Sequence, residues 1–280
     1  TVPRSATRLT AMIDVHQRLL YWAVCAWEDD FTGYVVDYGA WPDQGRNYWT
    51  LSGATKTIET QLPGKSLDEQ IYGALGTLAG GLIGREWQRD GGGVVRVERC
   101  TVDASWGPQT DTVYRFCRQS GYAAILMPSH GHFIGVTSKP MAEYQKREGE
   151  RIGMHWRISQ GAARSVKHVT FDSNWWKSFV HNRLAVQMGG KTALTLFGNR
   201  HQLHQILADQ LLAEKRVPAE ARGRVVDEWK LPPDKPDNHL LDCVVGCAVG
   251  ASIQGATLSN TNLDPSKKRV KFSQLQAQKR

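Results

Sequence analysis

Cysteine is scarce in this sequence and forms no recognisable pairs. The five cysteines include no C-x-x-C pair, and their number is odd. This pattern indicates neither a disulfide framework nor a zinc ribbon. We therefore interpret the cysteines as small buried apolar residues of a protein that works in a reducing compartment.

Long apolar runs are also missing. No uninterrupted apolar segment is long enough to span a membrane, and the N-terminus lacks the pattern of a secretory signal peptide. The sequence thus predicts no association with a membrane. The chain opens with TVPRSATRLT, close to the first expected strand and without an initiator methionine. We expect it to be excised from a longer protein.

A complete phosphate-binding loop is absent as well. The one candidate is GGKT at 189–192, but the full pattern requires a glycine where Ala185 stands. The expected order of elements is also reversed, because the loop should follow a strand and precede a helix. The sequence therefore argues against an ATPase motor within this chain.

What the sequence does have is a surplus of positive charge. Its 280 residues include 35 Lys and Arg against 27 Asp and Glu, for a formal net charge of +8. This balance favours a polyanionic partner, above all nucleic acid, although many basic proteins bind none.

The residues from 256 onward are rich in Ser, Asn, Gln and Lys. We expect a globular domain at 1–255 and a disordered basic tail at 256–280 that grips phosphates.

The apolar pattern predicts a mixed α/β fold. Residues 9–27 read as two strands around a turn at 16–18, and 32–41 read as a third, so the chain opens with an antiparallel meander. A capping box at Ser66 and Glu69 predicts a helix that runs to about Trp87. Segments 42–65 and 130–163 read as loops, the second with little order. The other expected elements are strand 94–105, a helix from 107, strands 122–129, 166–171 and 192–197, a helix capped by Asp172 or Ser173, helix 201–217, strand 223–233 and helix 237–252.

Three aspartates stand out by their positions in these elements. Asp14 lies inside the apolar first strand, Asp103 ends the fourth strand, and Asp242 lies in the late helix. If the first and fourth strands are neighbours, Asp14 and Asp103 point to one face, where a packed helix brings Asp242 to them. Such carboxylates have raised pKa values unless divalent cations lie among them. Mg²⁺ or Mn²⁺ suits these oxygen ligands. Two such ions about 3.5–4 Å apart can activate water and stabilise the leaving oxygen in phosphodiester hydrolysis.

Each aspartate also has a purely structural interpretation. Asp14 could cap a turn or face solvent on an edge strand, Asp103 could cap the helix near Pro108, and Asp242 could be solvated. For any single aspartate this interpretation is favoured, because Asp is mostly exposed in proteins. The strand, strand, helix order of all three favours a metal site instead.

A histidine accompanies the last aspartate. His239 precedes Asp242 by three residues, so the two share a helical face. In the first turn of a helix the positive end of the dipole favours neutral imidazole, which binds a metal or accepts a proton. The alternative is that Asp237 caps the helix and His239 lies at the surface.

The segment DNHLLDC at 237–243, taken with the first-strand and fourth-strand aspartates, resembles the nuclease domain of phage terminase large subunits. VVDEWKLPPDKPDNHLLDC is similar to the lambda-type branch, and the resemblance covers residues 9–253. It implies an RNase H-like fold and a metal-dependent endonuclease that cuts double-stranded DNA during genome packaging. It also implies that Asp14, Asp103 and Asp242 are the metal-binding carboxylates and that His239 is an auxiliary site residue. Family members often carry Glu at the second position, and Asp111 is a spare candidate.

The same resemblance implies partners and a setting. These are an ATPase motor domain in the same polypeptide, the terminase small subunit and the portal, in the cytoplasm of an infected bacterial host. Two other functions stay open at this point. One is another RNase H-like DNA enzyme, such as a junction resolvase or a transposase. The other is a non-catalytic module for DNA binding or docking.

Overall fold

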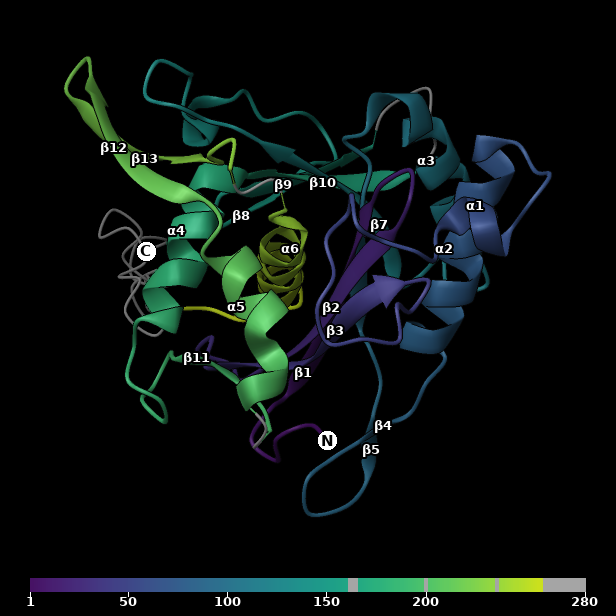
Figure 1. Ribbon diagram of the computed structural model, residues 1–280. Coiled ribbons are helices and arrows are strands. Elements are labelled where there is room, and N and C mark those ends of the chain that lie inside the picture. Colours follow the sequence, from purple (N-terminus) through teal and green to yellow (C-terminus); the bar gives the residue numbers. More distant parts are fainter. Residues whose placement is uncertain (161–165, 199–200, 235–236, 259–280) are drawn as a thin grey trace, which may run out of the picture.

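A nine-stranded mixed sheet forms the centre of the computed structural model (Figure 1). The structure describes residues 1–160, 166–198, 201–234 and 237–258. The strands follow the spatial order β11-β3-β2-β1-β6-β7-β10-β9-β8. In chain order they are β1 (Arg8–Val15), β2 (Leu20–Trp27), β3 (Gly33–Trp41), β6 (Arg99–Asp103), β7 (Leu126–His132), β8 (Arg151–Gly153), β9 (Trp156–Gln160), β10 (Lys167–Asp172) and β11 (Leu194–Leu196).

The sheet combines an antiparallel meander with parallel strands. β1, β2 and β3 pair antiparallel, whereas β1 with β6, β6 with β7, and β7 with β10 pair parallel. The central strands β1 and β2 are buried along nearly their whole length, which explains their almost continuous apolar sequence. The predicted fold class, a mixed α/β sheet of the RNase H-like kind, is confirmed.

Helices cover both faces of this sheet, and each face has its own apolar core (Figure 1). On one face pack α2 (Leu67–Ile83) and α3 (Thr110–Gln119), with the short α1 (Ile58–Gln61) beside them. On the other face pack α4 (Ser173–Leu184), α5 (Gln205–Leu211) and α6 (His239–Ile253).

Helix α6 approaches the sheet unusually closely, and small residues allow this. A Cβ added to Gly246 would lie 2.6 Å from the side chain of Met12 in β1. The Thr10 hydroxyl donates to the carbonyl of Cys247 over 2.8 Å. The contacts of Thr10 and Met12 show that α6 runs antiparallel to β1. Its N-terminal end therefore lies at the C-terminal end of that strand.

Two predicted boundaries near the first long helix are wrong. The capping box of Ser66 and Glu69 is present, but α2 ends at Ile83. Instead of continuing the helix, β4 (Trp87–Gln88) pairs with β5 (Val94–Val95) in a small ribbon outside the main sheet. The glycines at 91–93 all have positive φ and form its turn. The predicted strand 94–105 is consequently divided, and only β6 joins the sheet.

The predicted loop 130–163 is more ordered than expected over its described residues, 130–160. β7 extends to His132, and β8 and β9 add two antiparallel strands to the sheet edge. The Trp156 indole donates to the Ser252 hydroxyl over 2.9 Å, and this buried contact ties β9 to α6. A partner almost one hundred residues away leaves no local pattern in the sequence.

The predicted helix 201–217 is shorter in the structure. A 3-10 turn (His201–His204) leads into α5, after which β12 (Lys215–Ala221) pairs with β13 (Arg224–Lys230) in a projecting hairpin (Figure 1). Arg222 and Gly223 form its two-residue turn with positive φ. Pairing with β13 thus outweighs the helical pattern of 215–217.

The C-terminal segment lies mostly outside the described residues. Ala256 is buried and the Thr257 amide donates to the Asp29 carbonyl, so 256–257 still pack on the domain. The disorder and basic grip expected for the tail stay predictions. In the part of the chain that is described, no helix combines the length and apolar character needed to cross a membrane.

Candidate active site

The first two aspartates are neighbours on adjacent strands. β1 and β6 run parallel with Ile13 opposite Val102, so Asp14 and Asp103 follow side by side. Two residues earlier on each strand, Met12 and Thr101 both contact α6 at Gly246. Because side chains alternate along a strand, both aspartates point to the α6 side of the sheet.

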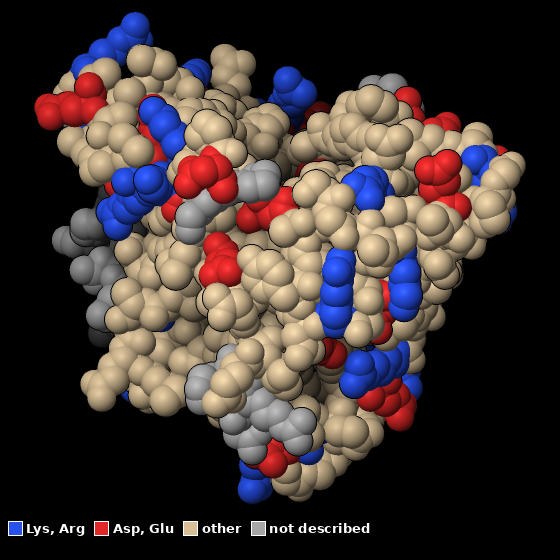
Figure 2. Space-filling view, viewed as in Figure 1, with Lys and Arg blue, Asp and Glu red and all other residues tan. Residues whose placement is uncertain are grey.

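The start of α6 completes the group. Asp242 and His239 lie in its first turn and line the same cavity of about 370 Å³ as Asp14 and Asp103. The structure thus brings together all four residues selected from the sequence, whereas the spare candidate Asp111 in α3 does not line this cavity. Figure 2 shows a cleft at the upper centre of this face, between the side that carries the hairpin and the side that carries α1–α3, with acidic side chains inside it.

Asp14 is the most enclosed of the carboxylates and receives two imidazoles. It is 6% exposed. His16 Nε2 lies 2.9 Å and His239 Nδ1 3.0 Å from its Oδ2 atom. Burial by itself would raise the pKa of Asp14, but the charge and hydrogen bonds of the two histidines outweigh burial and hold that pKa well below its ordinary value. Asp14 is therefore ionised at neutral pH.

The surroundings of Asp103 and Asp242 favour the ionised carboxylate less than those of Asp14 do. Burial and the nearby charge of Asp14 raise the pKa of Asp103 to about 7, against a weaker opposing hydrogen bond from the Ser105 amide. Burial also raises the pKa of Asp242, although the Lys177 ammonium 3.0 Å from its Oδ1 atom opposes this shift. A group of carboxylates with raised pKa values is an environment that a divalent cation would stabilise.

The donor atoms of this cavity fit such a cation. Asp14, His16 and His239 each offer one ligand atom, and these atoms lie within 4.8 Å of one another. Asp103 and Asp242 line the same cavity and add carboxylate oxygens. Carboxylate and imidazole are ligands that divalent metal ions accept.

One family model, described as terminase large subunit gpA, endonuclease domain, matches residues 1–263. The chain belongs to this family. Searches of curated proteins and of solved structures found no match. The resemblance seen in the DNHLLDC segment is thereby confirmed, and the role of the chain is that of a nuclease in genome packaging.

The sequence did not single out Lys177, Glu214 or His16 for this candidate site, whereas Asn238 lies in the DNHLLDC segment that carried the resemblance. Lys177 of α4 forms ion pairs with Glu214 and with Asp242. Asn238 donates to Glu214 and, over 3.2 Å, to Asp242. The contacts of Glu214 with Lys177 and with Asn238 join elements far apart in the chain, so no local pattern predicts them. The contact of Asn238 with Asp242 spans only four residues at the start of α6. His16 did leave a signal, because Asp-x-His places both side chains on one side of a strand.

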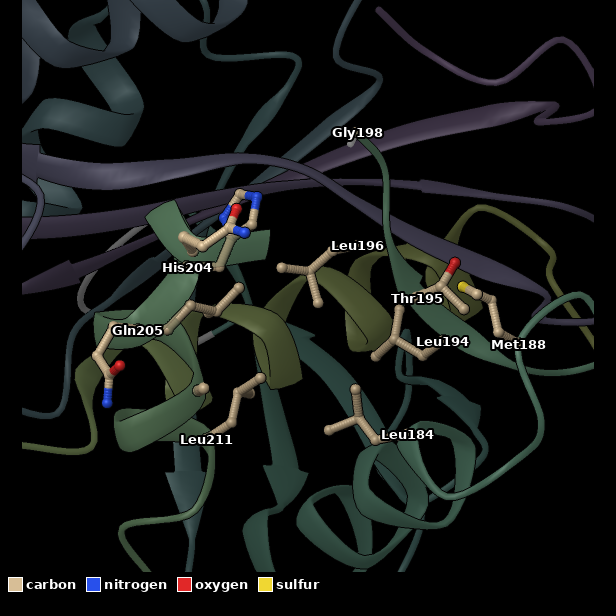
Figure 3. A pocket seen from close by; sticks show the side chains of 12 residues that line it. Leu184, Met188, Leu194, Thr195, Leu196, Gly198, His204, Gln205 and Leu211 are labelled. Carbon is tan, nitrogen blue, oxygen red and sulfur yellow. The ribbon is translucent and has the colours of Figure 1, made fainter. Parts of the chain in front are cut away.

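A larger cavity of the terminase nuclease lies elsewhere and has a different character. It measures about 790 Å³ and lies among α4, β11 and α5 (Figure 3). The described residues that line it include no Asp or Glu. They are mainly apolar, among them Leu184, Met188, Leu194, Leu196 and Leu211. The chemistry of the lining, rather than its volume, identifies the smaller cavity as the candidate active site.

Proposed function

We propose that this terminase nuclease domain cuts double-stranded DNA by metal-dependent hydrolysis of phosphodiester bonds. In this proposal Asp14, Asp103 and Asp242 are the metal ligands, and His239 is an auxiliary site residue. The observation that carries it is the meeting of these four side chains in one cavity from β1, β6 and α6. Membership of a nuclease family supports the assignment to hydrolysis.

The expected metal is Mg²⁺ or Mn²⁺, with two ions in the site. Bound ions of this kind supply Lewis-acid stabilisation for the attacking and leaving oxygens of an in-line displacement. The raised pKa values of Asp103 and Asp242 support the need for added positive charge.

The residues of the chain itself have separate roles in this proposal. Asp14 stays ionised because two imidazoles hold it, so it offers a charged ligand at neutral pH. Lys177 lines the cavity, where its ammonium would attract a phosphate and limit repulsion between Asp242 and the substrate. His239 fixes the position of Asp14 through their 3.0 Å contact.

The substrate and setting follow from charge and family. A net charge of +8 favours contacts with DNA phosphates, which position a duplex without reading its sequence. We extend the proposal to the packaging partners that the family implies: a motor domain in the same polypeptide, the terminase small subunit and the portal, in the cytoplasm of the infected bacterial host.

Plasmid cleavage tests the proposal directly. Supercoiled plasmid is incubated with Mg²⁺ or Mn²⁺ and wild type, Asp14→Ala or Asp242→Ala. Asp111→Ala serves as the matched control, because it removes an aspartate outside the cavity. We expect nicking and linearisation by wild type and the control alone, and none in excess EDTA. Full activity of Asp14→Ala, or cutting in EDTA, would refute the proposal.

If no variant cuts although all are folded, a gel shift with linear duplex tests whether the domain still binds DNA. Binding without cutting identifies a DNA-binding module. If wild type does cut, a preference for four-way junctions over linear duplex would identify a resolvase-like specificity instead.

A further inference from the structure

His16 lies in the candidate active site, where the roles given above use it only as a hydrogen-bond partner of Asp14. Its Nε2 atom is 2.9 Å from Asp14 Oδ2, and His239 Nδ1 is 3.0 Å from the same oxygen. The ligand atoms of these three residues lie within 4.8 Å of one another. The group consists of two imidazole nitrogens and one carboxylate oxygen around a common point.

These spacings suit direct coordination of one ion. For metal–ligand bonds of about 2.1 Å, adjacent ligand atoms of an octahedron are about 3.0 Å apart and opposite atoms about 4.2 Å apart. The two nitrogen–oxygen distances, 2.9 and 3.0 Å, are close to the adjacent spacing, and the 4.8 Å limit on all three ligand atoms accommodates the distance between the two nitrogens. An ion would therefore need little rearrangement of the protein.

Asp14 and His239 are enclosed by neighbouring side chains, whereas His16 is partly exposed to the cavity. Asp14 and His239 are each 6% exposed, and the Tyr21 ring stacks on His239 at a centroid distance of 4.5 Å. The side chain of His16 is 33% exposed and lines the cavity. Water or a phosphate oxygen could thus reach an ion held at this point.

One ring nitrogen of His239 lacks a hydrogen-bond partner among the described residues. This atom, Nε2, is also buried. A buried histidine with a purely structural role normally satisfies both ring nitrogens. The contact to Asp14 uses Nδ1, so among the described residues the ring of His239 is only partly satisfied.

We propose that His16, Asp14 and His239 form a two-histidine, one-carboxylate site for a divalent first-row transition-metal ion. The inference rests on the proposed function, since this ion would occupy part of the same active site. Imidazole nitrogen favours transition metals over Mg²⁺, which prefers oxygen ligands and retains water. His16 thus sets which metal the site takes, while Asp103 and Asp242 offer oxygen donors that suit Mg²⁺ as well.

Metal binding by the full 280-residue chain tests this assignment without relying on cleavage. Isothermal titration with Co²⁺, Mn²⁺ and Mg²⁺ is combined with the visible absorption of bound Co²⁺, which responds to nitrogen ligands. The variants are His16→Ala and the similarly sized His16→Gln, so that a folding defect in one leaves the other. His132→Ala is the control, because it removes an exposed histidine that does not line the cavity.

We expect both His16 variants to bind Co²⁺ and Mn²⁺ at least about tenfold more weakly than wild type and to change the cobalt spectrum. Mg²⁺ affinity should change far less, and the control should match wild type for all three ions. Unchanged Co²⁺ affinity and an unchanged spectrum in a folded His16 variant would overturn the inference.

Plasmid cleavage on the same samples keeps the two proposals apart. If Co²⁺ binding depends on His16 but wild type cuts no DNA with any of the three ions, the metal site stands and the nuclease mechanism fails. If wild type cuts with Mg²⁺ and His16 has no influence on Co²⁺ binding, the mechanism stands and the transition-metal site fails.

Discussion

Single residues in the candidate active site differ sharply in the charge state that the fold imposes on them. Asp14 is held ionised by two histidines, whereas Asp103 has a pKa of about 7. For Asp103 the folded-state pKa lies above the unfolded value, so the folded state binds its proton more tightly. The free energy of unfolding should therefore fall as the pH rises from about 4 to 7, where only the unfolded state has lost that proton.

Asp103→Asn should remove this pH-dependent loss, because the amide carries no charge. In EDTA we expect the variant to melt about 2–4 °C above wild type at pH 8, equivalent to roughly 1 kcal/mol, and to show little difference at pH 4. Thermal unfolding followed by circular dichroism measures both. Added Mn²⁺ should raise the melting temperature of wild type more than that of the variant. A variant with equal shifts at pH 4 and pH 8 would contradict this account.

Lys177 contributes a buried positive charge, which forms ion pairs with the two acidic side chains Glu214 and Asp242. The side chains of Lys177 and Glu214 are 11% and 3% exposed, and Lys177 also contacts Asp242. Lys177→Met leaves Glu214 buried without its cation, so we expect a loss of about 3–5 kcal/mol in the free energy of unfolding. Urea denaturation measures this loss. Lys65→Met, at an exposed lysine, should cost little, and adding Glu214→Gln to Lys177→Met should restore part of the stability.

At the scale of elements, the close approach of α6 to β1 determines where Asp242 and His239 lie. A Cβ at Gly246 would lie 2.6 Å from Met12, whereas a Cβ at Gly250 would lie 3.4 Å from Thr10. Gly246→Ala should therefore destabilise the domain by about 1–3 kcal/mol and weaken metal binding, because α6 must shift. Gly250→Ala is the matched control and should be neutral or slightly stabilising, since alanine is the better helix former. Chemical denaturation and metal titration of both variants decide between these outcomes.

The elements also show which parts of the fold a sequence can predict. The meander and the capped helix α2 depend on neighbouring residues, and their patterns predicted them. The meeting of Asp14, Asp103 and Asp242 was predictable once β1 and β6 were taken as neighbours. Strands β8 and β9 were missed, because they depend on distant contacts such as that of Trp156 with Ser252. The start of β12 was taken as the end of helix 201–217, whereas β13 was predicted within strand 223–233. Lys177 and Glu214 were missed for the same reason as β8 and β9.

At the scale of the whole molecule, positive charge is unevenly arranged around an acidic cleft. Basic side chains stand on the β12–β13 hairpin at one side of the cleft and around α1 and α2 at the other (Figure 2). The hairpin begins directly after Glu214, whose partner Lys177 lines the candidate active-site cavity. A duplex whose phosphate reaches the cavity would thus pass close to this hairpin, while the carboxylates below would repel it until a cation is bound.

The hairpin tip makes the strongest test of this arrangement. Arg222 is exposed in its two-residue turn. If it contacts a phosphate, Arg222→Ala should weaken binding to any duplex equally and reduce the slope of log K against log salt by about 0.9, the value for one phosphate contact. Fluorescence anisotropy with two unrelated duplexes between 50 and 200 mM salt measures that slope. Over this range a protein that makes many phosphate contacts loses about 10³-fold or more in DNA affinity. Arg96→Ala is the control and should leave the slope unchanged. Arg96 is exposed, lies beside the β4–β5 ribbon and forms an ion pair with Glu86. Equal slopes for Arg222→Ala and wild type would show that DNA approaches the cleft without touching the hairpin tip, leaving the basic residues around α1 and α2 as the surface that receives it.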